Sequence, residues 1–352
     1  MTPLAHLIVA RIAATGPITV ADYMADCLLH PLHGYYTTHD PFGAQGDFIT
    51  APEISQMFGE LIGLALAQVW LDQGSPPRIV LAELGPGRGT LMADALRATA
   101  IVPGFHAAVQ VHLVESSARM RARQAVLVPD AIWHETVASL PEAPLYLIAN
   151  EFFDALPVRQ FVRDGFGWRE RMVGVTHEAL TFGLTAQTRF GRLEHRLADT
   201  KDGDLVELCP ALPAIVTEIG ARIARHGGAA LLIDYGDWRS QGDTLQAVQG
   251  HQGTDPLIAP GSADLTAHVD FEAIAMACAP ALHTRLTPQG VFLNRLGIGQ
   301  RAERLAAGLT GAGLNHHMDA YRRLTDADKM GHLFKVIGLL PPHAPPLPGL
   351  LT

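Results

Sequence analysis

The chain has only three cysteines in 352 residues, Cys27, Cys209 and Cys278, and they are far apart in the sequence. No CxxC pair occurs, so neither a disulfide framework nor a structural zinc site is expected. The 17 histidines form no HExxH or comparable spacing, and we therefore predict no metal ion. Such cysteine usage fits a reducing compartment.

Positive charge is also scarce, with 26 Lys and Arg against 35 Asp and Glu and a formal net charge of −9. The basic residues do not cluster, which argues against a nucleic-acid partner. No apolar run approaches the roughly 18 residues of a membrane span. The N-terminal residues lack the repeated Arg and Ser of a transit segment, so we expect a cytoplasmic protein.

Apolar residues, by contrast, make up 48% of the chain and follow a clear pattern. From residue 79 onward, short apolar runs alternate with helix-length segments. Strands without polar alternation, separated by helices, indicate a mostly parallel sheet covered on both faces, that is, a doubly wound α/β fold. The expected strands are 79–84, 109–114, 131–134, 145–149, 229–234 and 333–339, and the expected helices are 90–98, 117–126 and 264–279.

A glycine-rich motif lies between the first of these strands and the helix that follows it. It contains Glu83, Gly85, Pro86, Gly87 and Gly89. Glycine allows a sharp turn and close approach of the backbone to a ligand, and the helix start favours a carboxylate or phosphate. A dinucleotide GxGxxG fingerprint would need Gly or Ala at position 90 or 92, where Thr and Met stand. The pattern ExGxGxG instead resembles motif I of S-adenosylmethionine methyltransferases.

Acidic and amide side chains follow three further strands, where open α/β sheets bind ligands. Glu115 ends the second strand and is placed to bind ribose hydroxyls. Asn150, Glu151 and Asp154 follow the apolar strand 145–149, and Asp234 ends another. We expect this edge to orient a reacting group, although a polar helix cap with two core Phe residues would also explain the sequence after residue 149.

The segment before residue 79 predicts a separate N-terminal part. Residues 1–78 are expected to form a helical cap with a loop over the cofactor, and residues 79–352 the main domain, with a substrate-side insertion at about 155–205. Thr50 and Glu53 have the spacing of a capping box. Together with Asp47 they could instead cover the cofactor, and both interpretations stay open.

Long and unusual strings recur along nearly the whole chain and identify a family. The chain resembles the MidA-like methyltransferases, which are related to a mitochondrial assembly factor for respiratory complex I. The strings that carry the resemblance lie at residues 16–24, 34–36, 46–60, 83–91, 111–115, 149–158, 233–236, 264–271 and 331–336.

This resemblance implies a class I methyltransferase that uses S-adenosylmethionine and acts on a protein, namely an arginine of a complex I subunit. Glu83, the motif glycines, Glu115 and Asn150 would bind the cofactor. Glu151 would hold the guanidinium, with Asp154 and Asp234 as further candidates and His268 and Asp270 lining the cleft. Two alternatives remain, another methyl acceptor and an assembly factor with little catalysis. A dehydrogenase is disfavoured by the glycine spacing.

Overall fold

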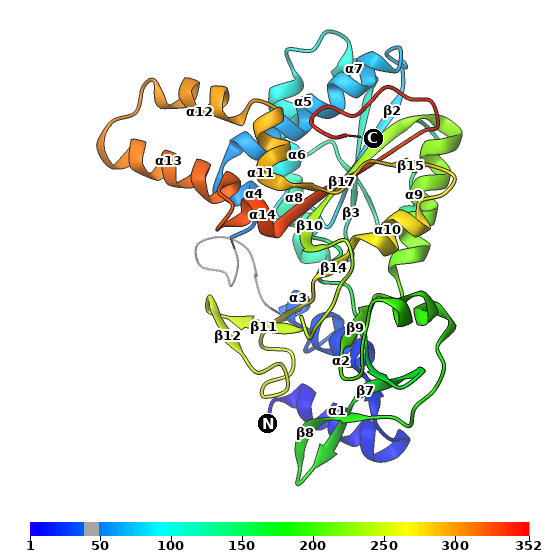
Figure 1. Ribbon diagram of the computed structural model, residues 1–352. Helices are drawn as coiled ribbons and strands as arrows, with labels where there is room; N and C mark the ends of the chain where they lie inside the picture. The colour runs from blue at the N-terminus through cyan, green and yellow to red at the C-terminus, as the bar shows by residue number, and fades with distance from the viewer. Residues whose placement is uncertain (39–48, 352) are drawn as a thin grey trace. The chain divides into compact units, whose positions relative to one another are not determined.

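The protein forms two compact units. The computed structural model describes residues 1–38 and 49–351. Residues 1–38, 154–212 and 237–270 form the smaller unit, and residues 49–153, 213–236 and 271–351 form the larger one. Figure 1 follows the chain through both. In the part of the chain that the structure describes, no helix is long and apolar enough to cross a membrane.

A mostly parallel sheet is the centre of the larger unit. Its strands are β2 (Ile79–Leu84), β3 (Val109–Val114), β4 (Ile132–His134), β5 (Leu145–Asn150), β10 (Gly228–Asp237), β15 (Leu282–His283), β16 (Thr287–Pro288) and β17 (Phe334–Leu340). The main order is β15-β17-β10-β5-β2-β3-β4. The strand β17 runs antiparallel to β10, β15 and β16, whereas neighbouring strands from β10 to β4 are parallel. The chain leaves β2 toward β3 and β4 and returns to the other side of β2 at β5. This reversal is a topological switch point, where such sheets bind ligands.

Both faces of this sheet are covered, which confirms the doubly wound α/β class. In β10, Ala229, Leu231 and Ile233 face one core cluster, whereas Ala230 and Leu232 face the opposite side and are equally buried. Figure 1 shows α9 on one side of the sheet and α5, α11 and α12 on the other. The helices are α4 (Ala51–Ile54), α5 (Gln56–Asp72), α6 (Thr90–Thr99), α7 (Phe105–Ala108), α8 (Ala118–Leu127), α9 (Leu212–His226), α10 (Phe271–Ala277), α11 (Gln289–Arg295), α12 (Ile298–Ala306), α13 (Gly311–Thr325) and α14 (Met330–Leu333).

The helix α5 belongs to the larger unit, so the units do not divide at residue 78 as the sequence led us to expect. Two glycines on α5 allow it to pack closely on α6. A Cβ on Gly59 would lie 2.8 Å from Cβ of Asp94, and one on Gly63 would lie 2.6 Å from Cα of Ala95. Close helix packing thus joins residues 49–72 to the sheet domain rather than to the N-terminal segment.

The smaller unit combines the N-terminal segment with the expected insertion. Its larger sheet has the order β1-β7-β6-β9, with β8 paired to β7, and a second sheet has the order β12-β11-β13. Ile18 of β1 pairs with Val173 of β7, which brings residues far apart in the sequence into one sheet. Its elements are α1 (Pro3–Thr15), β1 (Ile18–Thr19), α2 (Val20–Leu29), α3 (Tyr35–Thr38), β6 (Arg159–Asp164), β7 (Gly167–Thr176), β8 (Ala179–Leu184), β9 (Leu205–Leu208), β11 (Gln246–Gln249), β12 (Gln252–Thr254), β13 (Asp264–Thr266) and β14 (Val269–Asp270).

The helix expected over residues 264–279 is wrong in its first half. There, β13 pairs with β11, with Leu265 opposite Ala247, and helix α10 begins only at Phe271. All three residues of β13 are buried, so burial here follows neither the helical period nor simple alternation when the partner strand is not known. Pairing with a strand about 20 residues earlier decides the structure of this segment.

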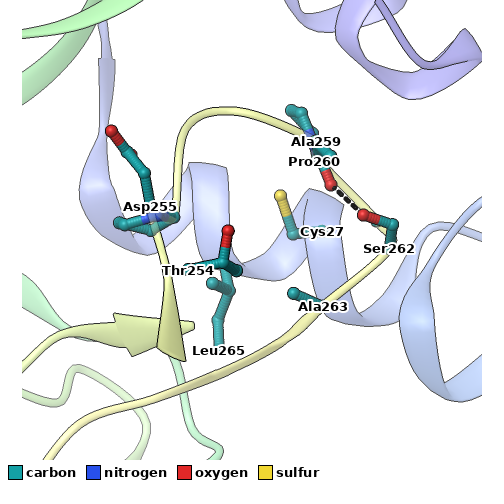
Figure 2. A pocket seen from close by; sticks show the side chains of 10 residues that line it. Cys27, Thr254, Asp255, Ala259, Pro260, Ser262, Ala263 and Leu265 are labelled. Atoms are coloured by element: carbon teal, nitrogen blue, oxygen red, sulfur yellow. Dashed lines mark hydrogen bonds between the residues drawn. The ribbon is translucent and has the colours of Figure 1, made fainter. Parts of the chain in front are cut away.

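A water-sized cavity of about 10 Å³ lies in the smaller unit between α2 and the segment 254–265 (Figure 2). Cys27 lines it, and burial raises the pKa of this thiol to about 12. The hydroxyl of Tyr23 donates to the carbonyl of Pro256 beside it. Because the cavity is too small for an organic ligand and the thiol stays protonated, Cys27 is part of the core rather than a reactive group.

Candidate active site

The loop between β2 and α6 is shaped by glycine. Gly85, Gly87 and Gly89 have φ angles of +58°, +52° and +88°, in the left-handed region that other residues rarely adopt. A Cβ on Gly85 would also lie 2.9 Å from Cδ2 of Phe152. Gly89 is the N-cap of α6 and has no side chain to bond the first N–H groups of the helix. The loop therefore offers a helix N-terminus at the carboxyl end of β2, which suits a carboxylate or a phosphate.

Glu83 is buried beside the first turn of α6. Its carboxylate accepts a hydrogen bond from the main-chain N–H of Met92, and burial raises its pKa to about 8. Its Oε2 atom has no hydrogen-bond partner among the described residues. A buried carboxylate with an unfilled acceptor is costly unless a bound group completes it. A positively charged group of a ligand would favour the charged form of Glu83, lower this pKa and fill the acceptor.

Glu115, at the tip of β3, is tied to the glycine loop through Gln124 of α8. The Nε2 atom of Gln124 donates to Oε2 of Glu115 at 3.1 Å and to the carbonyl of Gly87 at 2.8 Å. Its Oε1 atom accepts from Nε1 of Trp133 at 2.8 Å, and the main-chain N–H of Ser117 donates to Glu115 Oε1. Gln124 was not among the expected site residues. The sequence signal for it is its position one helical turn after Met120, which places both on the same face of the helix.

The turn after β5 holds the residues expected at the transfer site. Glu151 has a φ of +50°, a strained value for a residue with a side chain. Its Oε1 atom accepts from Nδ2 of Asn150 at 2.9 Å and from the main-chain N–H of Ala51 at 3.0 Å. The Oδ1 atom of Asn150 is buried and has no hydrogen-bond partner among the described residues. An amide oxygen and a carboxylate therefore lie together at this sheet edge, and the amide oxygen is left to accept a hydrogen bond from a ligand.

The carboxylate of Asp234, on β10, binds the main chain of this turn. Its Oδ2 atom accepts from the main-chain N–H groups of Phe152 at 3.2 Å and Phe153 at 2.9 Å, and Oδ1 accepts from the N–H of Tyr235. The side chain is 1% exposed. A carboxylate that accepts three main-chain N–H groups is best suited to fixing the turn. The substrate contact suggested for Asp234 from the sequence stays a prediction.

Helix α4 does not have the capping box expected at its start. Thr50 is the N-cap, but its side chain makes no capping hydrogen bond. The carboxylate of Glu53 accepts instead from the hydroxyl of Thr90, at 2.6 Å. Thr50 and Glu53 thus lie in the same unit as the glycine loop, whereas Asp47 lies outside the described residues.

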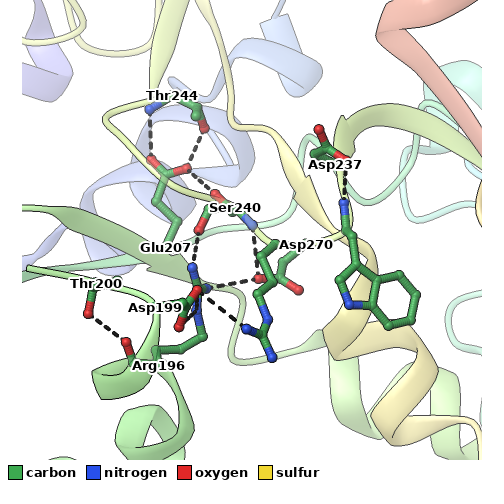
Figure 3. Close-up of polar contacts among 10 residues, drawn as sticks. Arg196, Asp199, Thr200, Glu207, Asp237, Ser240, Thr244 and Asp270 are labelled. Carbon is green, nitrogen blue, oxygen red and sulfur yellow. Dashed lines mark hydrogen bonds and ion pairs between the residues drawn. The ribbon is translucent and has the colours of Figure 1, made fainter.

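The other expected site residues, Asp154, His268 and Asp270, belong to the smaller unit. Figure 3 shows Asp270 in a polar network with the buried Arg196. Oδ2 of Asp270 accepts from Nη1 of Arg196 at 3.4 Å and from the main-chain N–H of Ser240 at 3.1 Å. The main-chain N–H of His268 donates to Oγ1 of Thr244, and that of Ala267 donates to the carbonyl of Asp154. These contacts hold the segments 237–244 and 264–270 together.

Comparison with known proteins decides the family. The model of a family of S-adenosyl-L-methionine-dependent methyltransferases matches residues 61–288. The chain belongs to this family. The mitochondrial protein arginine methyltransferase NDUFAF7 of Mus musculus is 38% identical, over 97% of this chain and 85% of that protein. Its Homo sapiens counterpart is 35% identical, over 97% and 84%. A Burkholderia thailandensis protein solved with bound S-adenosyl-homocysteine matches with a TM-score of 0.82 and 30% identity, over 98% of this chain and 94% of that one.

The resemblance to the MidA-like family is thereby confirmed, and S-adenosylmethionine is the cofactor of this methyltransferase. The residues at the carboxyl edge of the sheet fit it. The N-terminus of α6 suits the carboxylate of the methionine part, and the unfilled acceptor of Glu83 suits its positive charge. Glu115 at the tip of β3 suits the ribose hydroxyls.

Gln124 is expected to strengthen cofactor binding by the methyltransferase. Changing Gln124→Leu removes the links to Gly87 and Glu115 and leaves the indole N–H of Trp133 without its acceptor. We expect S-adenosylhomocysteine to bind about tenfold more weakly and the free energy of unfolding to fall by about 1–3 kcal/mol. Calorimetry and urea unfolding measure the two effects. Gln68→Leu, on the exposed face of α5, is the matched control, and equal behaviour of both variants would contradict the role of Gln124.

Proposed function

We propose that this methyltransferase methylates an arginine side chain of a protein, and that the acceptor is a subunit of respiratory complex I. The names of the mouse and human relatives support an arginine acceptor. The resemblance to a family related to a complex I assembly factor supports the second part. The observation that carries the proposal is the pair of acceptors after β5, the Glu151 carboxylate and the Asn150 amide oxygen.

These acceptors match the chemistry of a guanidinium group. Bound S-adenosylmethionine supplies an electrophilic methyl group on a sulfonium. A guanidinium has only N–H donors and a pKa above ~12, so it must be oriented and its charge balanced before a nitrogen can attack. In our proposal Glu151 balances that charge and accepts the proton that the nitrogen loses on methylation. The Asn150 amide oxygen orients a second N–H, and Asp234 keeps the turn rigid.

The acceptor can be tested directly. The purified protein is incubated with S-adenosylmethionine carrying an isotope-labelled methyl group and with dissociated complex I subunits, and the products are mapped by mass spectrometry. We expect label on an arginine of one subunit. Label on another residue type or on a small molecule would refute the arginine acceptor. Cofactor binding without any transfer would favour a non-catalytic assembly factor. The cytoplasmic location expected from the sequence stays a prediction.

A further inference from the structure

Glu53 connects helix α4 to the cofactor-binding loop. Its Oε1 atom accepts the hydroxyl hydrogen of Thr90 at 2.6 Å, and its Oε2 atom lies 3.8 Å from Nη1 of Arg88. Thr90 is the first residue of α6 and directly follows Gly89. One carboxylate, 37 residues earlier in the chain, therefore contacts the residues on both sides of the last glycine of the loop.

The start of α4 is anchored at the other side of the switch point. The main-chain N–H of Ala51 donates to Oε1 of Glu151 at 3.0 Å, and Nη2 of Arg323 donates to the carbonyl of Ile49 at 3.3 Å. The four-residue helix thus spans from the turn after β5 to the loop after β2. Both are loops at the carboxyl edge of the sheet, on neighbouring strands.

Helix α4 is not stabilised by contacts within its own residues alone. A helix of four residues is unstable without outside contacts, and the usual local support would be the capping box of Thr50 and Glu53. That box does not form, because Thr50 makes no side-chain cap. The Glu53 carboxylate, whose side chain is 18% exposed, is directed to Thr90 and Arg88 instead.

We propose that α4 is a latch on the cofactor loop and that Glu53 is a positioning residue for cofactor binding. By holding Thr90 and Arg88, it keeps the loop from Gly85 to Gly89 in one conformation before the cofactor arrives. A loop ordered in advance loses less conformational entropy on binding, so the cofactor binds more tightly. This latch concerns cofactor binding only, and it holds for any methyl acceptor.

A double-mutant cycle on S-adenosylhomocysteine binding tests the latch without any measurement of activity. Glu53→Ala and Thr90→Val are each expected to raise the Kd in calorimetry about tenfold, the effect of a lost charged hydrogen bond. The double variant is expected to match either single variant, because the same contact is lost. Thr90→Ser keeps the hydroxyl and is expected to bind like the parent protein.

Asp94→Asn is the matched control, since Asp94 lies on the same helix α6 and pairs with Arg97 at 2.6 Å. It is expected to leave the Kd unchanged. Melting temperatures of all variants separate binding from stability. Additive weakening would show that Glu53 and Thr90 do not act through one contact, and a lower melting temperature with an unchanged Kd would make α4 only a structural element. Either result would overturn the latch. If Glu53→Ala does not fold, the comparison of Thr90→Val with Thr90→Ser still tests the latch, because these two variants differ in the hydroxyl that donates to Glu53.

Discussion

Glu151→Gln is expected to lower the turnover of methyl transfer by about 10²–10³-fold, while S-adenosylhomocysteine binds with a Kd within about twofold of the parent value. The Gln side chain keeps an oxygen that can accept from Ala51 and Asn150, so the turn after β5 is preserved. What it loses is the negative charge that balances a guanidinium and accepts its proton. The variant therefore separates the chemistry from cofactor binding.

Turnover is measured under saturating cofactor with the labelled acceptor, and binding by calorimetry. Glu142→Gln is the matched control, because Glu142 lies in the same unit with its side chain 69% exposed. It is expected to behave like the parent protein. Unchanged turnover in Glu151→Gln would remove Glu151 from the catalytic residues. Loss of both turnover and cofactor binding would show that Glu151 acts by anchoring α4 rather than on the acceptor.

The free energy of unfolding is expected to depend on pH through Glu83. Its pKa is about 8 in the folded protein, because the carboxyl group is buried, against 4.5 for an exposed Glu. Between these two values the folded state holds a proton that the unfolded state has released. The free energy of unfolding therefore falls as pH rises from about 4.5 to 8, by at most about 1.4 kcal/mol per pH unit from this one group. Below pH 4.5 the group is protonated in both states and adds no further slope.

Glu83→Gln removes this contribution. Urea unfolding of the apo protein at pH 5.5 and 7.5 is expected to show that the stability of the variant relative to its parent increases by about 2–3 kcal/mol over these two pH units. The difference between the two proteins is the quantity to compare, because burial also raises the pKa of Glu115 and Glu207 and gives both proteins a slope of the same sign. A difference independent of pH would contradict the raised pKa of Glu83.

Much of the larger unit could be predicted from local sequence. The strands expected at 79–84 and 109–114 match β2 and β3 at both ends, and 145–149 falls one residue short of β5. These central strands are buried on both faces, so their apolar runs end where the chain reaches the sheet edge. The glycine loop could be predicted for a related reason, because its φ angles require glycine whatever surrounds it.

The long-range contacts could not be predicted in this way. The pairing of Ile18 with Val173, the strand β13 and the contact of Glu53 with Thr90 each depend on a partner far away in the sequence. Periodicity describes one segment at a time, so the sequence could not decide between a capping box and a cover for the cofactor at Thr50 and Glu53. Gln124 was not predicted as a site residue for the same reason, since it matters through the link that it makes between Glu115 and Gly87.

We infer that the loop from Gly85 to Gly89 binds S-adenosylmethionine. This binding is tested most directly by calorimetric titration of the purified protein with S-adenosylmethionine and, separately, with NAD, alongside a Gly87→Val variant. Gly87 has a φ of +52°, which a β-branched residue does not tolerate. We predict binding of S-adenosylmethionine alone, and its loss in the variant. Binding of NAD, or binding of S-adenosylmethionine that survives the substitution, would show that this loop is not the cofactor site.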